Sequence, residues 1–266
     1  MRLQHAPSNE TILLREDRDG VVTLTLNRPA QFNALSEEML AALQAALDDI
    51  AADEGVRCVV LAGAGKAFCA GHDLKQMRAN PRQDYYEALF AGCSRVMQAI
   101  VNLPVPVIAR VHGMATAAGC QLVASCDLAV AAESATFAVS GINVGLFCST
   151  PAVALSRNVS PKHAFDMLVT GRFVPAAEAL SFGLVSRTAP DAGLDAALAA
   201  LTEQICAKSA VAIRTGKAMF SRQRSMGLEE AYAYAGSVMA CNMMAEDAAE
   251  GIDAFIGKRK PEWKGR

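Results

Sequence analysis

The sequence predicts an α/β fold with parallel strands, followed by a helical C-terminal region. Short apolar runs typical of strands alternate with helical segments through the first half of the chain. From about residue 160 the pattern becomes mostly helical. The chain has 266 residues, 52% of them hydrophobic, so it can bury a substantial core. We place the core at residues 1–200 and the helical region at residues 201–266.

The first elements follow from local sequence patterns. Residues 21–26 alternate apolar and polar side chains, as a half-buried strand does, and Pro29 ends the run. Ser36 then precedes two glutamates and a helical repeat of leucines and alanines, which predicts a capped helix over residues 37–52. Residues 56–62 predict an apolar strand that ends in a Gly-Ala-Gly turn.

The middle of the chain continues the alternation of helices and strands. A helix is predicted over residues 85–101, and the prolines that follow it end it. Residues 107–111 and 128–132 predict two more strands. Residues 228–256 are rich in alanine and methionine and predict a helical appendage with a large apolar surface. The pattern leaves open whether this surface packs on a neighbouring subunit or within the chain.

Composition excludes several classes of function. The formal net charge is −2, so the chain lacks the excess positive charge that favours nucleic acid or an anionic membrane surface. The chain has no apolar run of about 18 residues and no signal-peptide core at its start, so we expect a cytoplasmic protein without membrane insertion. The eight cysteines lack metal-ligand spacing, so we expect free thiols and no bound metal.

Two glycine-containing turns are the candidate site. Residues 68–74 (FCAGHDL) and 112–120 (HGMATAAGC) each follow an apolar strand-like run. Small residues at a strand–helix junction can expose backbone N–H groups at the positive end of the helix dipole. Two such N–H groups aimed at one point stabilise an enolate or a tetrahedral oxyanion. Either turn taken alone is explained equally well by close packing.

Several further segments, in the same order along the chain, strengthen the functional interpretation. They are Leu26-Asn27-Arg28-Pro29, Asn33-Ala34-Leu35, residues 67–74, Val111-His112-Gly113 with Gly119-Cys120, Cys126-Asp127, residues 168–173 (LVTGRF), residues 179–185 (ALSFGLV) and residues 255–261 (FIGKRKP). With these motifs the chain resembles the crotonase (enoyl-CoA hydratase/isomerase) superfamily over about residues 10–264.

The resemblance implies a fold, an assembly and a ligand. The fold is the ClpP/crotonase-like spiral of ββα units with a C-terminal helical region, assembled as trimers or dimers of trimers. The ligand is an acyl-CoA thioester, with coenzyme A entering as part of the substrate and no separate cofactor. The resemblance also implies that the backbone N–H groups of His72 and Ala118 form the oxyanion hole.

The resemblance also implies how coenzyme A is held. The segment Ala70, Gly71, Asp73 and Leu74 would lie along it, with the backbone of residues 70–72 at its adenine end. Lys258 would reach a coenzyme A held mostly by another subunit. Arg28 and Lys66 are weaker candidates for the phosphates, since lone surface cations are commonly just solvated.

The departures from the family pattern concern acid–base chemistry. Family hydratases carry glutamates at two positions that are Gln121 and Gly141 here. The aspartate of the dienoyl-CoA isomerases is matched by Ser149. A positioned acid or base contributes about 10²–10⁴-fold to a rate. Efficient ordinary hydration is therefore not expected, whereas thioester binding can persist.

No nearby side chain is an evident replacement for the glutamates. Asn143, Ser149 and Thr150 can position water but are poor bases, and Cys148 has no evident histidine partner. We expect structural roles for His112, Asp73 and Glu133. Some naphthoate synthases of the family have glycine at the position of Gly141 and recruit bicarbonate as the base, so bound bicarbonate or ordered water remains a candidate here.

Residues 115–127 and 143–151 are most similar to a divergent subgroup, the enoyl-CoA hydratase domain-containing proteins. The leading hypothesis is an enzyme that stabilises a thioester enolate, for which decarboxylation of a malonyl-type thioester is well suited. The alternative is a non-catalytic acyl-CoA-binding or assembly protein. A nucleotide-binding protein is disfavoured because GxGxxG and GxxxxGK[ST] motifs are absent. Gln121→Glu combined with Gly141→Glu is expected to create hydratase activity.

Overall fold

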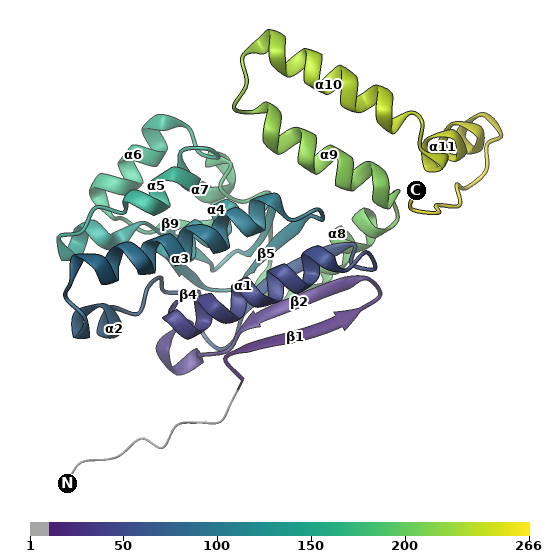
Figure 1. Ribbon diagram of the computed structural model, residues 1–266. Coiled ribbons are helices and arrows are strands. Elements are labelled where there is room, and N and C mark those ends of the chain that lie inside the picture. Colours follow the sequence, from purple (N-terminus) through teal and green to yellow (C-terminus); the bar gives the residue numbers. More distant parts are fainter. Residues whose placement is uncertain (1–10) are drawn as a thin grey trace.

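The computed structural model describes residues 11–266, in which two β-sheets are covered by helices (Figure 1). The larger sheet has the strand order β1-β2-β3-β5-β7-β10, and the smaller one has the order β4-β6-β8-β9. Neighbouring strands are parallel except for β1 with β2 and β8 with β9. The start of the chain, on which the location expectation rested, lies outside the described residues.

The strands and the helices after them form a repeating ββα unit. In each unit one strand enters the larger sheet and the next enters the smaller sheet. The three units are β3 (Cys58–Gly63) and β4 (Ala67–Cys69) with α2 (Leu74–Ala79) and α3 (Gln83–Asn102); β5 (Val107–Val111) and β6 (Met114–Thr116) with α4 (Ala118–Ser125); and β7 (Leu128–Ala132) and β8 (Thr136–Ala138) with η2 (Ser140–Val144) and α5 (Ser149–Leu155). This repeat confirms the predicted crotonase-like spiral.

The remaining elements frame these units. They are β1 (Leu13–Arg18), β2 (Val21–Leu26), η1 (Pro29–Gln31), α1 (Glu37–Ala52), α6 (Pro161–Thr170), β9 (Val174–Pro175), α7 (Ala176–Phe182), β10 (Arg187–Ala189), η3 (Asp191–Gly193), α8 (Leu194–Cys206), α9 (Ala210–Gln223), α10 (Leu228–Asn242) and α11 (Glu246–Ile256). Helices α1 and α3 pack together on one side of the larger sheet (Figure 1).

Local pattern predicted several of the long elements but missed β1 and the short strands of the smaller sheet. The observed β2, α1, β5 and β7 have the expected bounds, and α1 begins with the Ser36 hydroxyl accepting from the N–H of Met39. The strand expected over residues 56–62 is β3, displaced by one or two residues. The three-residue strands of the smaller sheet were not predicted, because each is too short to show a period.

The core lies between the larger sheet and its helices. Its strands carry side chains such as Leu24, Val59 and Ile108, which are fully buried. All eight cysteines are free thiols, and six of them are buried. Burial raises the pKa of Cys69 and of Cys93 to about 12, so these thiols stay protonated and act as packing groups.

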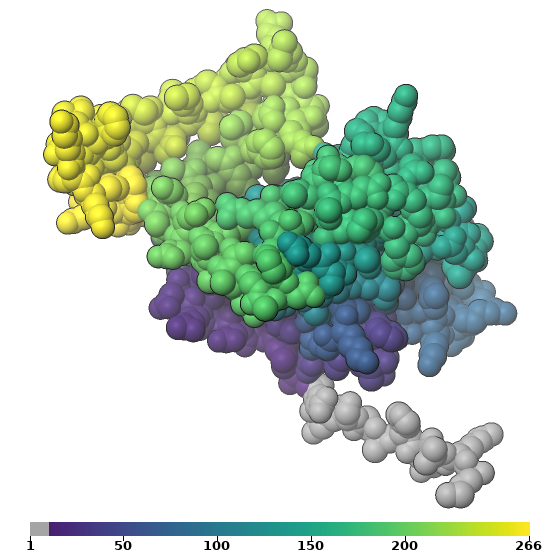
Figure 2. Space-filling view, turned by 180° about the vertical axis from the view of Figure 1, so that it is seen from behind, coloured from purple at the N-terminus to yellow at the C-terminus, as the bar shows by residue number. Residues whose placement is uncertain are grey.

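The last three helices project from the core as an arm (Figure 1). Helix α9 is anchored by Lys217, whose ammonium lies 2.6 Å from a carboxylate oxygen of Asp127 and donates to the carbonyls of Ile100 and Val105. Beyond it the expected helical stretch 228–256 is broken into α10 and α11. A groove of about 490 Å³ separates α9 and α10 from the end of α3, and Figure 2 shows the arm standing off the core.

No single helix within residues 11–266 is both long enough and apolar enough to cross a membrane. The segment Asp191–Cys206 and helix α9 reach that length together, but they are bent by 102° relative to each other.

Candidate functional site

The two glycine turns meet because they follow adjacent parallel strands. Strand β4 pairs with β6 in parallel, with Cys69 beside Ala115. The carboxyl ends of neighbouring parallel strands lie at the same edge of a sheet, so residues 70–72 and the start of α4 emerge side by side. The Thr116 hydroxyl donates to the carbonyl of Ala70 at 3.0 Å and ties one turn to the other.

Glycines allow the two turns to approach each other. Gly71 has φ +92°, and a Cβ placed on it would lie 2.9 Å from the Cβ of Ala117 and 3.1 Å from the nitrogen of Ala118. A Cβ on Gly119 would lie only 2.1 Å from the carbonyl oxygen of Cys69. Side chains at these positions would push the turns apart, so the glycines are required by the geometry of the site.

The turn before α4 contains a strained residue. Ala117 has φ 49° and ψ −118°, a conformation that is costly for a residue with a Cβ. Its N–H donates to the carbonyl of Ala138 on β8 at 2.9 Å, which holds the conformation in place. Helix α4 begins at the next residue, Ala118. The sequence offered no signal for this strain, because the residue is alanine rather than glycine.

Two backbone N–H groups are left free at this junction. Within residues 11–266, neither the N–H of His72 nor that of Ala118 has a hydrogen-bond acceptor. The Ala118 group belongs to the first turn of a helix of eight buried residues, where the helix dipole favours negative charge. A pair of free N–H groups from adjacent turns can hold a carbonyl oxygen and stabilise the charge it gains as an enolate or tetrahedral adduct.

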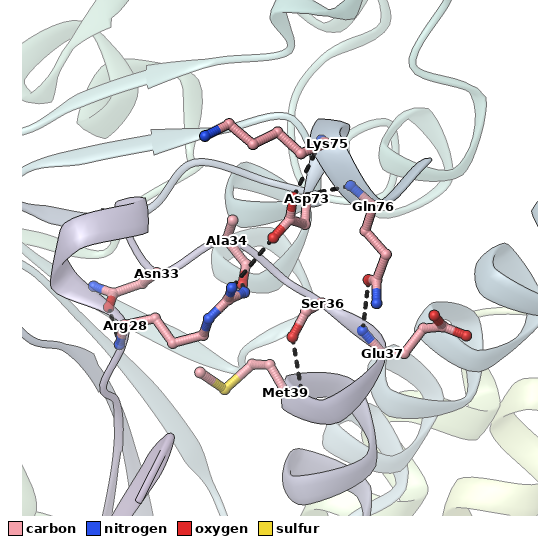
Figure 3. Close-up of polar contacts among 9 residues, drawn as sticks. All are labelled: Arg28, Asn33, Ala34, Ser36, Glu37, Met39, Asp73, Lys75 and Gln76. Carbon is pink, nitrogen blue, oxygen red and sulfur yellow. Dashed lines mark hydrogen bonds and ion pairs between the residues drawn. The ribbon is translucent and has the colours of Figure 1, made fainter. Parts of the chain in front are cut away.

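The first turn is supported by a polar network around Arg28 (Figure 3). The guanidinium of Arg28 lies 3.2 Å from a carboxylate oxygen of Asp73 and donates to the carbonyl of Ala34 at 3.0 Å. Asp73 also caps α2 by accepting from the N–H groups of Lys75 and Gln76. These contacts give Arg28 and Asp73 clear structural roles. The prediction that they contact coenzyme A stays a prediction.

Asn33 is a further residue that shapes the site. Its amide is fully buried and donates to the carbonyls of Ala64 and Ala67, both at 2.8 Å, while its oxygen accepts from the N–H of Arg28. It thereby fixes the loop that leads into β4. Sequence analysis included Asn33 only as part of a family motif, although its left-handed φ of 56° is a conformation that asparagine tolerates well.

The position of the first missing glutamate carries a buried amide. Gln121 lies one helical turn after Ala118 and is 4% exposed, and its Oε1 has no hydrogen-bond partner in the described part of the chain. Helical side chains generally lean toward the N-terminus of their helix, which for Gln121 is the end that carries Ala118. An unsatisfied buried carbonyl of this kind costs about 1–3 kcal/mol, and a bound water or ligand donor would recover it.

The position of the second missing glutamate is closed to side chains. A Cβ on Gly141 would lie 2.6 Å from the carbonyl oxygen of Leu146 and 2.7 Å from Sγ of Cys148. The N–H of Gly141 points to the same sulfur at 3.3 Å. A glutamate at this position therefore requires the turn to open, and the expected gain of hydratase activity in the double variant stays a prediction that depends on this movement. Burial raises the pKa of Cys148, which makes it a poor nucleophile.

Other predicted residues lie farther from the hole. Ser149 is exposed at the start of α5, and Asn143 donates to the carbonyl of Gly171. The His112 Nε2 lies 2.9 Å from the carbonyl oxygen of Gly65, in line with the structural role expected of it. Lys258 follows α11, at the opposite end of the molecule from α2 (Figure 1). The prediction that it reaches a coenzyme A held by another subunit stays a prediction.

Comparison with known proteins identifies the family. The family model described as enoyl-CoA hydratase/isomerase matches residues 16–266. The chain belongs to the enoyl-CoA hydratase/isomerase family. A crystal structure of an enoyl-CoA hydratase from Mycobacterium smegmatis has a TM-score of 0.95 at 63% identity, covering 96% of this chain and 99% of that one. The crotonase fold and the superfamily predicted from sequence are thereby confirmed.

The subgroup is confirmed by further members of the family. The mitochondrial enoyl-CoA hydratase domain-containing protein 3 of Mus musculus is 45% identical over 92% of this chain and 82% of its own length. That of Danio rerio is 42% identical over 99% of this chain and 91% of its own length. A crystal structure of the human protein of this name has a TM-score of 0.93 at 43% identity, covering 95% of this chain and all of that one.

These relatives also correct one expectation. We expected a cytoplasmic protein from the lack of a recognisable targeting segment, but the mouse and zebrafish members of the family are named mitochondrial. The cytoplasmic assignment is therefore wrong by this comparison. The expectation rested only on the composition of the first residues. Targeting segments are short and are recognised by composition alone, so this is a weak guide to where a protein is located.

Proposed function

We propose that this chain is an acyl-CoA enzyme in which the backbone N–H groups of His72 and Ala118 stabilise a thioester enolate. The observation that carries the proposal is the pair of free N–H groups at two turns that glycines and the Thr116 hydroxyl hold together. Coenzyme A enters with the substrate, and the enzyme uses no other organic cofactor.

Ordinary hydration of an enoyl-CoA is disfavoured by the residues around the hole. Water addition needs a group to remove a proton from water and a group to deliver one to the α-carbon. Gln121 cannot exchange a proton at neutral pH, and Gly141 has no side chain. The carboxylate of Asp73 is engaged with Arg28 and with the N-terminus of α2. Hydration would thus depend on a bound ion or on a histidine.

Decarboxylation of a malonyl-type thioester places smaller demands on the site. The electron pair of the bond to the departing carboxylate forms the enolate directly, and CO₂ leaves without a base. The two N–H groups then hold the negative oxygen, for which one donor contributes about 10²–10³-fold to kcat. A single proton delivered to the α-carbon completes the reaction.

The test compares two substrates and one designed variant. Purified protein is assayed for decarboxylation of methylmalonyl-CoA and for hydration of crotonyl-CoA, each with and without bicarbonate. Ala118→Pro removes one N–H from the hole at the first residue of α4, and its circular dichroism spectrum must match that of the wild type, because proline also restricts the unusual conformation of Ala117. We expect decarboxylation to exceed hydration, and Ala118→Pro to lower kcat by about 10²–10³-fold.

A matched control and two opposing outcomes make the test decisive. Ala210→Pro removes an N–H from the first residue of α9, away from the hole, and should leave turnover unchanged. Fast hydration without bicarbonate would mean that another acid–base group replaces the glutamates. Tight thioester binding without turnover of either substrate would support the non-catalytic acyl-CoA-binding alternative.

A further inference from the structure

The imidazole of His72 is a buried polar group that the hole itself does not use. Both ring nitrogens are buried, and neither has a hydrogen-bond partner of ordinary geometry within residues 11–266. The ring lies edge-on to Phe90 of α3, with the ring centres 5.5 Å apart. Buried side-chain nitrogens are normally satisfied, so a ring with two unpaired nitrogens needs an explanation.

The ring belongs to one of the two residues whose N–H groups form the proposed hole. His72 contributes its backbone N–H to the hole, so the imidazole branches from the residue that would hold the thioester oxygen. In such a hydrogen bond the nitrogen and oxygen are about 2.9 Å apart, and the carbonyl carbon and α-carbon follow directly. The residue that would hold the thioester oxygen through its N–H therefore also carries an imidazole.

The environment keeps the ring neutral at pH 7. Burial lowers the pKa of His72 from its ordinary value of 6.5, and the nearby carbonyl of Leu35 offsets only part of this effect. The carboxylates close by in sequence are occupied, since Asp73 pairs with Arg28 and Glu37 accepts from the Tyr85 hydroxyl. A neutral imidazole has one nitrogen with a free electron pair, so it can accept a proton.

We propose that the imidazole of His72 exchanges a proton with the α-carbon of the bound thioester, in place of the missing glutamates. A ring nitrogen removes the α-proton, and the electron pair of the C–H bond moves to the thioester oxygen held by the N–H groups of His72 and Ala118. The reverse step returns the proton from the imidazolium to the α-carbon. After decarboxylation the neutral ring first takes up a proton from solvent, and the imidazolium that forms then delivers this proton to the α-carbon of the enolate.

This inference rests on the proposed function, and one experiment separates the two. Butyryl-CoA labelled with ¹³C at the thioester carbonyl is added to the protein in D₂O. A downfield shift of the carbonyl signal reports the hole, whereas incorporation of deuterium at the α-carbon reports proton exchange. We expect both signals for the wild-type protein.

His72→Ala keeps the backbone N–H and removes only the ring. We expect this variant to retain the carbonyl shift and to lose α-deuterium exchange by about 10²-fold or more, as for a general base. His72→Gln keeps a polar side chain without basicity, so it should also lose exchange. His163→Ala removes an exposed imidazole on α6 and should exchange at the wild-type rate.

Imidazole ¹⁵N chemical shifts test contact directly. Histidine-labelled protein should show one His72 nitrogen changing its hydrogen-bonded state when butyryl-CoA binds, a change that a purely structural ring would not make. Exchange at wild-type rate in both His72 variants, or a carbonyl shift without any exchange in the wild-type protein, overturns the His72 proposal and leaves the hole intact. Absence of the carbonyl shift in the wild-type protein overturns both proposals.

Discussion

At the residue scale, small side chains matter as much as reactive ones. Gly71 and Gly119 allow the two turns to touch, and Ala117 accepts a strained conformation just before α4 begins at Ala118. Within residues 11–266, Oε1 of Gln121 and both ring nitrogens of His72 have no hydrogen-bond partner, so a bound molecule could supply one.

The contact at Gly119 leads to the first prediction. Gly119→Ala places a Cβ against the carbonyl of Cys69, so it should destabilise the protein by about 3 kcal/mol and lower thioester affinity. Urea unfolding and calorimetric binding of butyryl-CoA measure the two effects. Gly216→Ala is the matched control, because nothing lies within 4 Å of the added Cβ on helix α9. It should leave affinity unchanged and stabilise by up to about 1 kcal/mol. Equal stability of the two variants would contradict the packing argument.

At the scale of elements, acidic residues of α11 hold the C-terminal segment: Asp247 accepts from the N–H groups of Lys264 and Gly265, and Glu250 binds the chain before them. Glu250 of α11 binds Arg259 through two short contacts and accepts from the N–H of Glu262. The side chain of Trp263, the only tryptophan, then packs against Gly251 and donates to the carbonyl of Ala207 on the neighbouring segment. Tryptophan fluorescence therefore reports whether this segment is docked.

The second prediction concerns the pH dependence of this docking. The hydrogen bonds from Arg259 and from the backbone of Glu262 lower the pKa of Glu250 from 4.5 to about 2. A lowered pKa contributes stability above pH 4.5 that is lost as the pH falls through about 2, so Trp263 should become more exposed across this window.

A variant isolates the contribution of Glu250. Glu250→Gln should shift the Trp263 emission to longer wavelength already at pH 6 and flatten its dependence on pH below 4.5. Glu229→Gln, at an exposed glutamate without an ion pair in the described part of the chain, serves as the control. Far-ultraviolet circular dichroism separates local release from global acid unfolding. Identical pH profiles for the wild type and Glu250→Gln would refute this assignment.

At the scale of the whole molecule, the C-terminal arm is too apolar to remain uncovered. Leu228, Met244 and Phe255 are 76%, 85% and 85% exposed along α10 and α11. Large apolar side chains left exposed along an arm are typical of an interface. Helix α11, which Lys258 follows, lies at the opposite end of the molecule from α2 (Figure 1). Both observations favour the predicted homo-oligomer.

The third prediction is an oligomeric mass. Light scattering after gel filtration should give three or six times the chain mass of 28.0 kDa. Met244→Lys combined with Phe255→Lys adds charge to the exposed apolar face and should shift the mass toward the monomer. Leu14→Lys changes an exposed apolar residue of β1, outside the arm, and should leave the mass unchanged. A wild-type monomer at micromolar concentration would be inconsistent with this interpretation of the arm.

The sequence by itself predicted several long elements and the family, and the family resemblance pointed to the N–H groups of His72 and Ala118. Strand β2 and helix α1 could be predicted because periodicity and an N-cap act locally over many residues. The motif at residues 67–74 identified the family and, through it, His72. Gln121 and Gly141 could be located by counting from matched glycines. These properties are carried by residue type and spacing alone.

Only the tertiary structure decided which hydrogen-bond partners and how much space the residues of the site have. Segments 46 residues apart join when Thr116 donates to Ala70, and Arg28 is drawn to Asp73 rather than left as a free surface cation. The closed space at Gly141 and the unpaired nitrogens of His72 depend on atoms from distant segments. Whether a polar group finds a hydrogen-bond partner, and whether a side chain has room, depends on the residues that folding brings next to it. These residues come from distant segments, so the local sequence does not predict them.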